Sequence, residues 1–207
     1  VGMSPLSPVK GYRFHFSEGE SEQDLTDLIF KEIDEFAINN NILSCNFLYV
    51  DYKWARLAEN ANCTKWLNKS SLWTSSNEKT FSDYLNRFNA NQRRNIKRER
   101  NAIKNMGINI SIIKGGQIKI KHMKLMHQFY KQHCARWGIW GSKYLTQSFF
   151  EELINSEAIN NIILFCAYRG NIEEPIAMSL CVVNNKMLWG RYWGCKEEIN
   201  YLHFELC

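Results

Sequence analysis

Apolar side chains recur along most of the chain, and their spacing changes from one third of the chain to the next. Residues 24–40 carry them every three or four positions, which predicts a helix with Asp24 as its N-cap. Residues 45–50 and 64–74 have the pattern of strands, and residues 53–61 that of a short helix. The first third is therefore typical of an α-β-α-β segment at the end of an α/β unit.

The middle third is predicted to be mainly helical. Thr80 and Asp83 form a capping-box pattern, which predicts the start of a long helix that ends before Gly107. On this helix Arg93, Lys97, Arg100 and Lys104 would follow one flank of the apolar stripe. Arg94 and Arg98 would lie nearer the opposite side. The expected elements are helix, strand, helix and helix, over residues 80–106, 108–113, 118–137 and from about 148.

The last third has the alternation of strands, over residues 162–168, 175–183 and 186–193. Gly170-Asn171 and Asn184-Asn185 supply turns between them, which predicts an antiparallel meander. Strict alternation would place Trp189, Arg191 and Trp193 on one face and Tyr192 on the other. Ala177, Ser179 and Cys181 would form a face of small residues, which lets a helix or a ligand approach closely. We favour the packing of a helix.

Composition narrows the class of protein. A hydrophobic content of 45% supports a packed core and excludes global disorder. No apolar run reaches the ~18 residues of a membrane span, and no secretory signal is visible. The seven cysteines include no C-x-x-C pair, so we expect reduced cysteines, no metal site and a cytoplasmic protein. Because the chain starts and ends abruptly, we expect it to be a fragment of a longer protein.

Positive charge is concentrated in one segment. Residues 87–143 hold fourteen Lys and Arg residues but one acid, Glu99, which gives this segment a net charge of +13. Each flanking segment carries −4, so an anionic partner is indicated by the local asymmetry. The alternative is a solvated helix face, the usual fate of a charge run. The candidate residues for binding phosphate or another anion are Arg93, Arg94, Lys97, Arg98 and Arg100.

Three further groups of residues are candidates for chemistry. Arg191 lies within a predicted strand, where it binds an anionic group or forms a salt bridge at the strand end. The aromatic loop with Trp140 and Tyr144 lines a cleft or packs locally. His203 and Glu205 are two positions apart, about 200° on a helix, so they do not aim at one atom there. Either alone suits an acid–base group or a polar anchor.

Three motifs stand out along the chain. The first joins the strand end Gly190-Arg191-Tyr192-Trp193-Gly194-Cys195 to Leu202-His203-Phe204-Glu205-Leu206-Cys207. The others are Phe81-Ser82-Asp83-Tyr84-Leu85 followed by the basic run that starts at Arg93, and Lys143-Tyr144-Leu145-Thr146 with Phe149-Phe150. Together these motifs resemble the bacterial FemAB-like family of the GNAT acyltransferase superfamily. The similarity spans nearly the whole chain, and the first motif is the most specific.

The resemblance implies a GNAT-like α/β (α+β) fold, a mixed but mostly antiparallel sheet flanked by helices. Residues 1–75 would be the C-terminal part of a first GNAT-like unit, and residues 76–207 the N-terminal part of a second. It also implies an enzyme that transfers an acyl or aminoacyl group to an amine, with a cell-wall precursor as acceptor. The substrate-binding residues would be Arg191, Tyr192, Trp193, Trp140 and Tyr144, and the catalytic residues His203 and Glu205.

The donor and the competing functions stay open at this point. In the GNAT superfamily an R/Q-x-x-G-x-G/A turn binds the pyrophosphate of acyl-CoA; here Arg191 and Gly194 match, but the last position is Lys196. Acyl-CoA and aminoacyl-tRNA are therefore both candidate donors. The alternatives to a transferase are a nucleic-acid-binding module that uses residues 87–143 and a protein that recognises a nucleotide-linked cell-wall precursor without catalysis.

Overall fold

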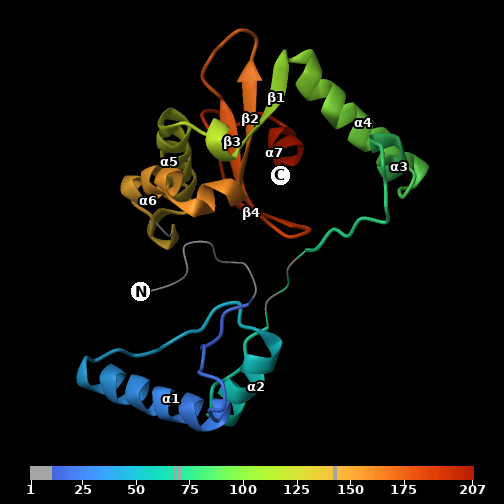
Figure 1. The fold of residues 1–207 in the computed structure, drawn as a ribbon. Helices are drawn as coiled ribbons and strands as arrows, with labels where there is room; N and C mark the ends of the chain where they lie inside the picture. The colour runs from blue at the N-terminus through green and yellow to red at the C-terminus, as the bar shows by residue number, and fades with distance from the viewer. Residues whose placement is uncertain (1–10, 68, 70, 142–143) are drawn as a thin grey trace. The chain divides into compact units, whose positions relative to one another are not determined.

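The computed structural model describes residues 11–67, 69, 71–141 and 144–207 (Figure 1). Contacts between Cα atoms divide the chain into two compact units, Val1–Trp73 and Thr74–Cys207. We call them the first and the second unit. That they correspond to parts of two GNAT-like units stays a prediction.

The first unit consists of two helices around an aromatic cluster. Helix α1 covers Glu22–Asn39 and helix α2 covers Tyr52–Asn60. Ser21, rather than Asp24, caps α1, because its side chain accepts a hydrogen bond from the Asp24 backbone N–H. Between the helices, rings pack edge-on and tilted within about 6 Å of one another, and they belong to Phe14, Phe30, Phe47 and Trp54.

The two strands predicted in this unit are wrong. In its described residues the extended pairing is limited to one isolated bridge between Tyr12 and Val50. Tyr49 has a positive φ of 57°, which interrupts the extended backbone of residues 45–50. The described residues of 64–74 form no ladder, and residues 68 and 70 of that prediction lie outside the described part. Apolar alternation therefore did not suffice, because a strand needs a neighbour to satisfy its backbone groups.

The second unit contains a four-stranded antiparallel sheet. Its strands are β1 Ile108–Lys114, β2 Ile162–Arg169, β3 Ala177–Asn184 and β4 Met187–Cys195, in the order β1-β2-β3-β4. Each strand pairs with the next, so the predicted meander is confirmed. With helices on both sides of the sheet, the predicted fold class, a mixed α+β fold with a mostly antiparallel sheet, is confirmed as well.

Different helices cover the two faces of the sheet (Figure 1). Helices α5 Ile120–Ala135 and α6 Gln147–Glu152 pack against one face, in a core that includes Leu164, Met178 and Leu180. Helix α7 Leu202–Leu206 packs against the other face, where the sheet presents Ala167 and Ala177. Short 3₁₀ helices complete the unit at Gly115–Gln117, Gly138–Trp140, Leu153–Asn155 and Glu157–Asn161.

The long helix predicted over residues 80–106 is two helices, α3 Phe81–Leu85 and α4 Ala90–Asn105. The predicted capping box of Thr80 and Asp83 is confirmed at the start of α3. A second box breaks the run: Asn89 accepts from the Gln92 backbone N–H at 2.9 Å, and its own backbone N–H donates to the Gln92 side chain at 3.1 Å. Asn89 is thereby held extended as an N-cap, which ends one helix and starts the next.

Candidate functional site

A hollow of about 440 Å³ lies where α4 and β1 meet α7 in the second unit. Helix α4 contributes three cations to its wall, Lys97, Arg100 and Lys104. The carboxylate in the wall is that of Glu205 on α7. We call this place the basic hollow; its other polar groups are the amides of Asn101 and Asn109, and its apolar wall includes the ring of Phe81.

Arg100 and Glu205 form a bidentate ion pair across the basic hollow. The Arg100 Nε lies 3.0 and 3.1 Å from the two carboxylate oxygens, and its Nη2 lies 2.9 Å from Oε1. The guanidinium also stacks over the Phe81 ring at 4.2 Å from the centroid. The Glu205 side chain is 16% exposed and that of Arg100 is 45% exposed, so the carboxylate is the more buried partner of a pair that solvent reaches. A planar fork with a carboxylate on its edge and a ring on its face is held in one orientation.

Lys97 and Lys104 lie on the same side of α4 as Arg100, about one helical turn before and after it. Among the described residues neither lysine forms an ion pair. The wall of the basic hollow therefore keeps two cations that no carboxylate of the described residues neutralises. Such a surface attracts an anion, and three of the four residues predicted on that flank, all except Arg93, line the hollow.

The remaining predicted anion-binding residues are not brought to the basic hollow. Arg93 is half-buried and its guanidinium donates a hydrogen bond to the Phe88 carbonyl, so it fastens the turn between α3 and α4. Arg98 lies 3.7 Å from Glu99, its neighbour in sequence. Arg94 is exposed, away from the lining residues of the hollow.

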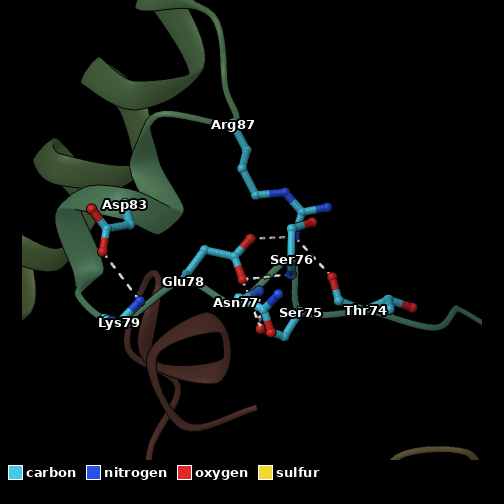
Figure 2. A network of polar contacts seen from close by, with 8 residues as sticks. All are labelled: Thr74, Ser75, Ser76, Asn77, Glu78, Lys79, Asp83 and Arg87. Atoms are coloured by element: carbon cyan, nitrogen blue, oxygen red, sulfur yellow. Dashed lines mark hydrogen bonds and ion pairs between the residues drawn. The ribbon is translucent and has the colours of Figure 1, made fainter.

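A polar network fixes the segment that leads into α3 (Figure 2). Arg87 donates to the Thr74 carbonyl and to Glu78, both at 2.9 Å, while the other Glu78 oxygen accepts from the Ser75 hydroxyl and the Ser76 N–H at 2.7 Å. The hydrogen bond from Ser75, with those from the backbone and the charge of Arg87, lowers the pKa of Glu78 to about 2. The network thereby holds the start of α3, the helix that supplies Phe81.

Strand β4 carries a bulge that the sequence did not reveal. Leu180 lies opposite Tyr192, but Cys181 lies opposite Gly190, so Arg191 is an extra residue in β4. Trp189 pairs with Val182 and Trp193 pairs with Ser179, which places the two tryptophans on opposite faces. The prediction that they share a face is wrong, because strict alternation fails at a bulge.

The bulge separates the three predicted substrate-binding residues of β4. The Tyr192 ring lies in the core against Tyr130 and Phe150, at 5.3 and 5.7 Å, and burial raises the pKa of Tyr192 to about 12. Arg191 stacks over that ring at 4.1 Å. Trp193 belongs to the α7 face, where it meets His203 edge-on at 5.0 Å.

His203 and Glu205 point to different neighbours, as their spacing predicts. Glu205 is committed to Arg100, whereas His203 is exposed and contacts Trp193 and Phe204. Tyr144 is exposed, and the Trp140 side chain and Lys143 lie outside the described part. Of the predicted site residues, the structure thus brings together Lys97, Arg100 and Glu205 in one place, and Trp193 and His203 in another.

The glycine of the GNAT-like turn has a packing role here. A Cβ built on Gly194 would lie 2.5 Å from the Phe129 Cβ and 2.6 Å from its carbonyl oxygen. Helix α5 therefore approaches β4 more closely than a side chain allows. This contact accounts for the glycine without any ligand.

The family model described as FemAB-like, peptidoglycan biosynthesis/recognition, matches residues 1–207. The chain belongs to the FemAB-like family. Its function is accordingly related to peptidoglycan. No curated protein matches this FemAB-like chain. Among the residues that the structure describes, no helix is both long and apolar enough to cross a membrane.

Some residues of the basic hollow in this FemAB-like chain were missed from sequence. Asn101 and Asn109 carry no signal of their own, and Phe81 was noted as part of a motif but not as a site residue, because their place in the wall depends on how α3 and β1 pack beside α4. Lys104 was visible through its spacing from Lys97 and Arg100, which recurs at three and four residues. The same spacing separates these cations from Arg94 and Arg98, but not from Arg93, which lies on the same flank and donates to the Phe88 carbonyl.

Proposed function

We propose that this FemAB-like chain is part of an N-acyltransferase that transfers an acyl or aminoacyl group to an amine of a cell-wall precursor. In this proposal the basic hollow binds phosphate groups of one substrate, either the donor or a nucleotide-linked acceptor. The observation that carries it is the set of three cations, Lys97, Arg100 and Lys104, around one hollow with one carboxylate. Lysine and arginine are the side chains that bind phosphate in proteins.

The bulged strand supports the choice of acyl transfer. Attack of an amine on a carbonyl carbon requires a group that takes the proton of the amine and donors that stabilise the oxyanion. Bulges recur next to active sites, and we place the oxyanion beside the bulge of β4, where the ladder with β3 shifts between Leu180 and Cys181. We assign the proton transfer to His203, the exposed imidazole beside Trp193, because Glu205 is held as the partner of Arg100.

The test is a transfer assay with the full chain. A UDP-linked muropeptide is incubated with the chain and, in separate reactions, with a panel of acyl-CoAs and with aminoacyl-tRNA, and the acceptor is weighed by mass spectrometry. We expect a mass gain of one acyl or aminoacyl group and, for His203→Ala, a rate lower by about 10²-fold or more. An unchanged rate in His203→Ala would remove the histidine from the proposal.

Binding without catalysis is the second candidate, because the family description covers recognition as well as biosynthesis. It predicts that the precursor binds and protects the chain against thermal unfolding. It also predicts that no donor produces a mass gain. The same reactions therefore distinguish the two candidates.

A further inference from the structure

We propose that Glu205 is a built-in competitor within the basic hollow, which selects phosphate-bearing ligands against carboxylate-bearing ones. This inference rests on the proposed role of the basic hollow in binding anions. It concerns what Glu205 does there: it occupies Arg100 as a ligand carboxylate would, and leaves Lys97 and Lys104 for a more highly charged group.

The first step is the match between Arg100 and Glu205. The Nε of Arg100 faces both carboxylate oxygens, at 3.0 and 3.1 Å, and Nη2 adds a third contact at 2.9 Å. A carboxylate from a ligand would offer the same two oxygens to the same fork. Exchange of one carboxylate for another gains no new contact at Arg100.

The second step is the way in which Glu205 is held. Leu202 and Leu206 are 1% and 3% exposed and anchor α7 in the core of its face of the sheet. Glu205 is therefore presented to Arg100 by a packed helix rather than by a free loop. A tethered group competes at an effective concentration of the order of millimolar or above, so a free carboxylate at lower concentration does not displace it.

The third step is the charge that remains. Lys97, Arg100 and Lys104 carry three positive charges and Glu205 one negative charge, so the wall has an excess of two cations. A phosphate group carries up to two charges and three acceptor oxygens. It can bind both lysines while Glu205 stays in place, or displace Glu205 with help from both. A diphosphate or a phosphate monoester therefore gains more than a carboxylate of the same size.

The test compares inorganic diphosphate with malonate, titrated calorimetrically into the full chain at low ionic strength. We expect the wild-type chain to prefer diphosphate, and Glu205→Gln to tighten malonate binding about fivefold and diphosphate binding less, which narrows the ratio of the two affinities. The matched control is Glu99→Gln, the same change of charge on α4 at a residue outside the hollow wall. It should change either affinity less than about twofold.

Several outcomes would overturn the inference. If Glu205→Gln changes the ratio of diphosphate to malonate affinity no more than Glu99→Gln does, Glu205 is not a competitor. If Glu205→Gln fails to fold, Glu205→Asp replaces it: the shorter side chain reaches Arg100 less well, so an unchanged ratio in that variant contradicts the competition. The double variant K97A/K104A distinguishes failure of the competition from failure of the proposed anion-binding role. If diphosphate affinity survives in K97A/K104A, the basic hollow does not bind anions. A loss in K97A/K104A together with an unchanged ratio in Glu205→Gln refutes the competition alone.

Discussion

On one face of the sheet, α5 and α6 bury large side chains such as Phe150, Met123 and Leu180, each with none of its surface exposed. On the other face, α7 lies against Ala167 and Ala177, and the wall of the basic hollow begins where that face meets α4. The first face is a closely packed core with aromatic rings in mutual contact. The second brings charged side chains of separate elements within hydrogen-bonding distance.

The comparison teaches how one sheet serves two purposes. Large residues on the α5 face supply most of the apolar burial and thereby hold the strands in register. Small residues on the α7 face let a short helix come close, so that its Glu205 reaches Arg100 on α4. Stability should consequently be lost most easily on the first face, and ligand binding on the second.

The largest effect is expected from Phe150→Ala. Phe150 is the fully buried residue of α6, and its removal leaves a cavity among Tyr130, His127 and Tyr192. We expect the free energy of unfolding to fall by about 3–5 kcal/mol, measured by urea denaturation. The control is Phe204→Ala on α7, where the ring is 76% exposed and the loss should stay within about 0.5 kcal/mol. Equal losses in the two variants would abolish the distinction between the faces.

A smaller loss is expected where α5 touches β4. Gly194→Ala would place a methyl group 2.5 Å from the Phe129 Cβ, so helix and strand must separate. We expect a loss of about 1–3 kcal/mol in the free energy of unfolding. Gly190→Ala is the matched control in the same strand, since nothing lies within 4 Å of its added Cβ. A Gly194→Ala variant as stable as Gly190→Ala would show that the close approach is not required.

The salt dependence of binding distinguishes the cations of α4 that line the basic hollow from those that do not. If the whole segment 87–143 bound nucleic acid through six or more phosphates, affinity for single-stranded RNA would fall by about 10²–10⁴-fold between 50 and 200 mM salt. We expect a change of less than about tenfold, measured by fluorescence anisotropy, because the basic hollow offers two cations, Lys97 and Lys104, that no carboxylate of the described residues neutralises. Removing Arg94 and Arg98 should then leave binding of the UDP-linked muropeptide unchanged within about twofold. A steep salt response that R94A/R98A reduces would favour a nucleic-acid-binding module.

The smallest effect concerns the network before α3. Because the pKa of Glu78 is held at about 2, below its ordinary 4.5, its carboxylate stabilises the folded chain above about pH 4.5. That contribution is lost as the pH falls toward 2. Glu78→Gln should therefore show a shallower decline in unfolding free energy across this range than the wild-type chain, in urea titrations at successive pH values. Parallel declines would mean that Glu78 does not stabilise the network.

Much of the second unit could be predicted because its signals are local. The alternation of residues 162–193 with Gly170 and Asn184-Asn185 at the turns predicted the meander, and the Thr80–Asp83 box predicted the start of α3. The break at Asn89 and the bulge at Arg191 were missed for a physical reason. The side-chain cap of Asn89 interrupts a helix, and the shifted ladder at Arg191 interrupts a strand. The spacing of apolar residues contains no information on either contact.

The candidate site was predictable to the extent that it lies on one helix. The spacing predicted a flank of four cations, of which Lys97, Arg100 and Lys104 line the basic hollow and Arg93 instead donates to the Phe88 carbonyl. Glu205 was singled out as a polar group, but its partner Arg100 lies 105 residues earlier, a distance over which spacing says nothing. The approach of α7 to α4 is a result of tertiary packing, and only the structure supplies it.

The most direct measurement is the affinity of a UDP-linked muropeptide for the full chain and its variants, by isothermal titration calorimetry. We predict that K97A/K104A, with both lysines of the basic hollow removed, binds at least about tenfold more weakly than the wild-type chain. The matched control is K114A/K121A, in which two exposed lysines of the basic segment outside the hollow wall are removed, and it should bind within about twofold of the wild type. Equal affinities in the two double variants would contradict the assignment of the basic hollow as the substrate site.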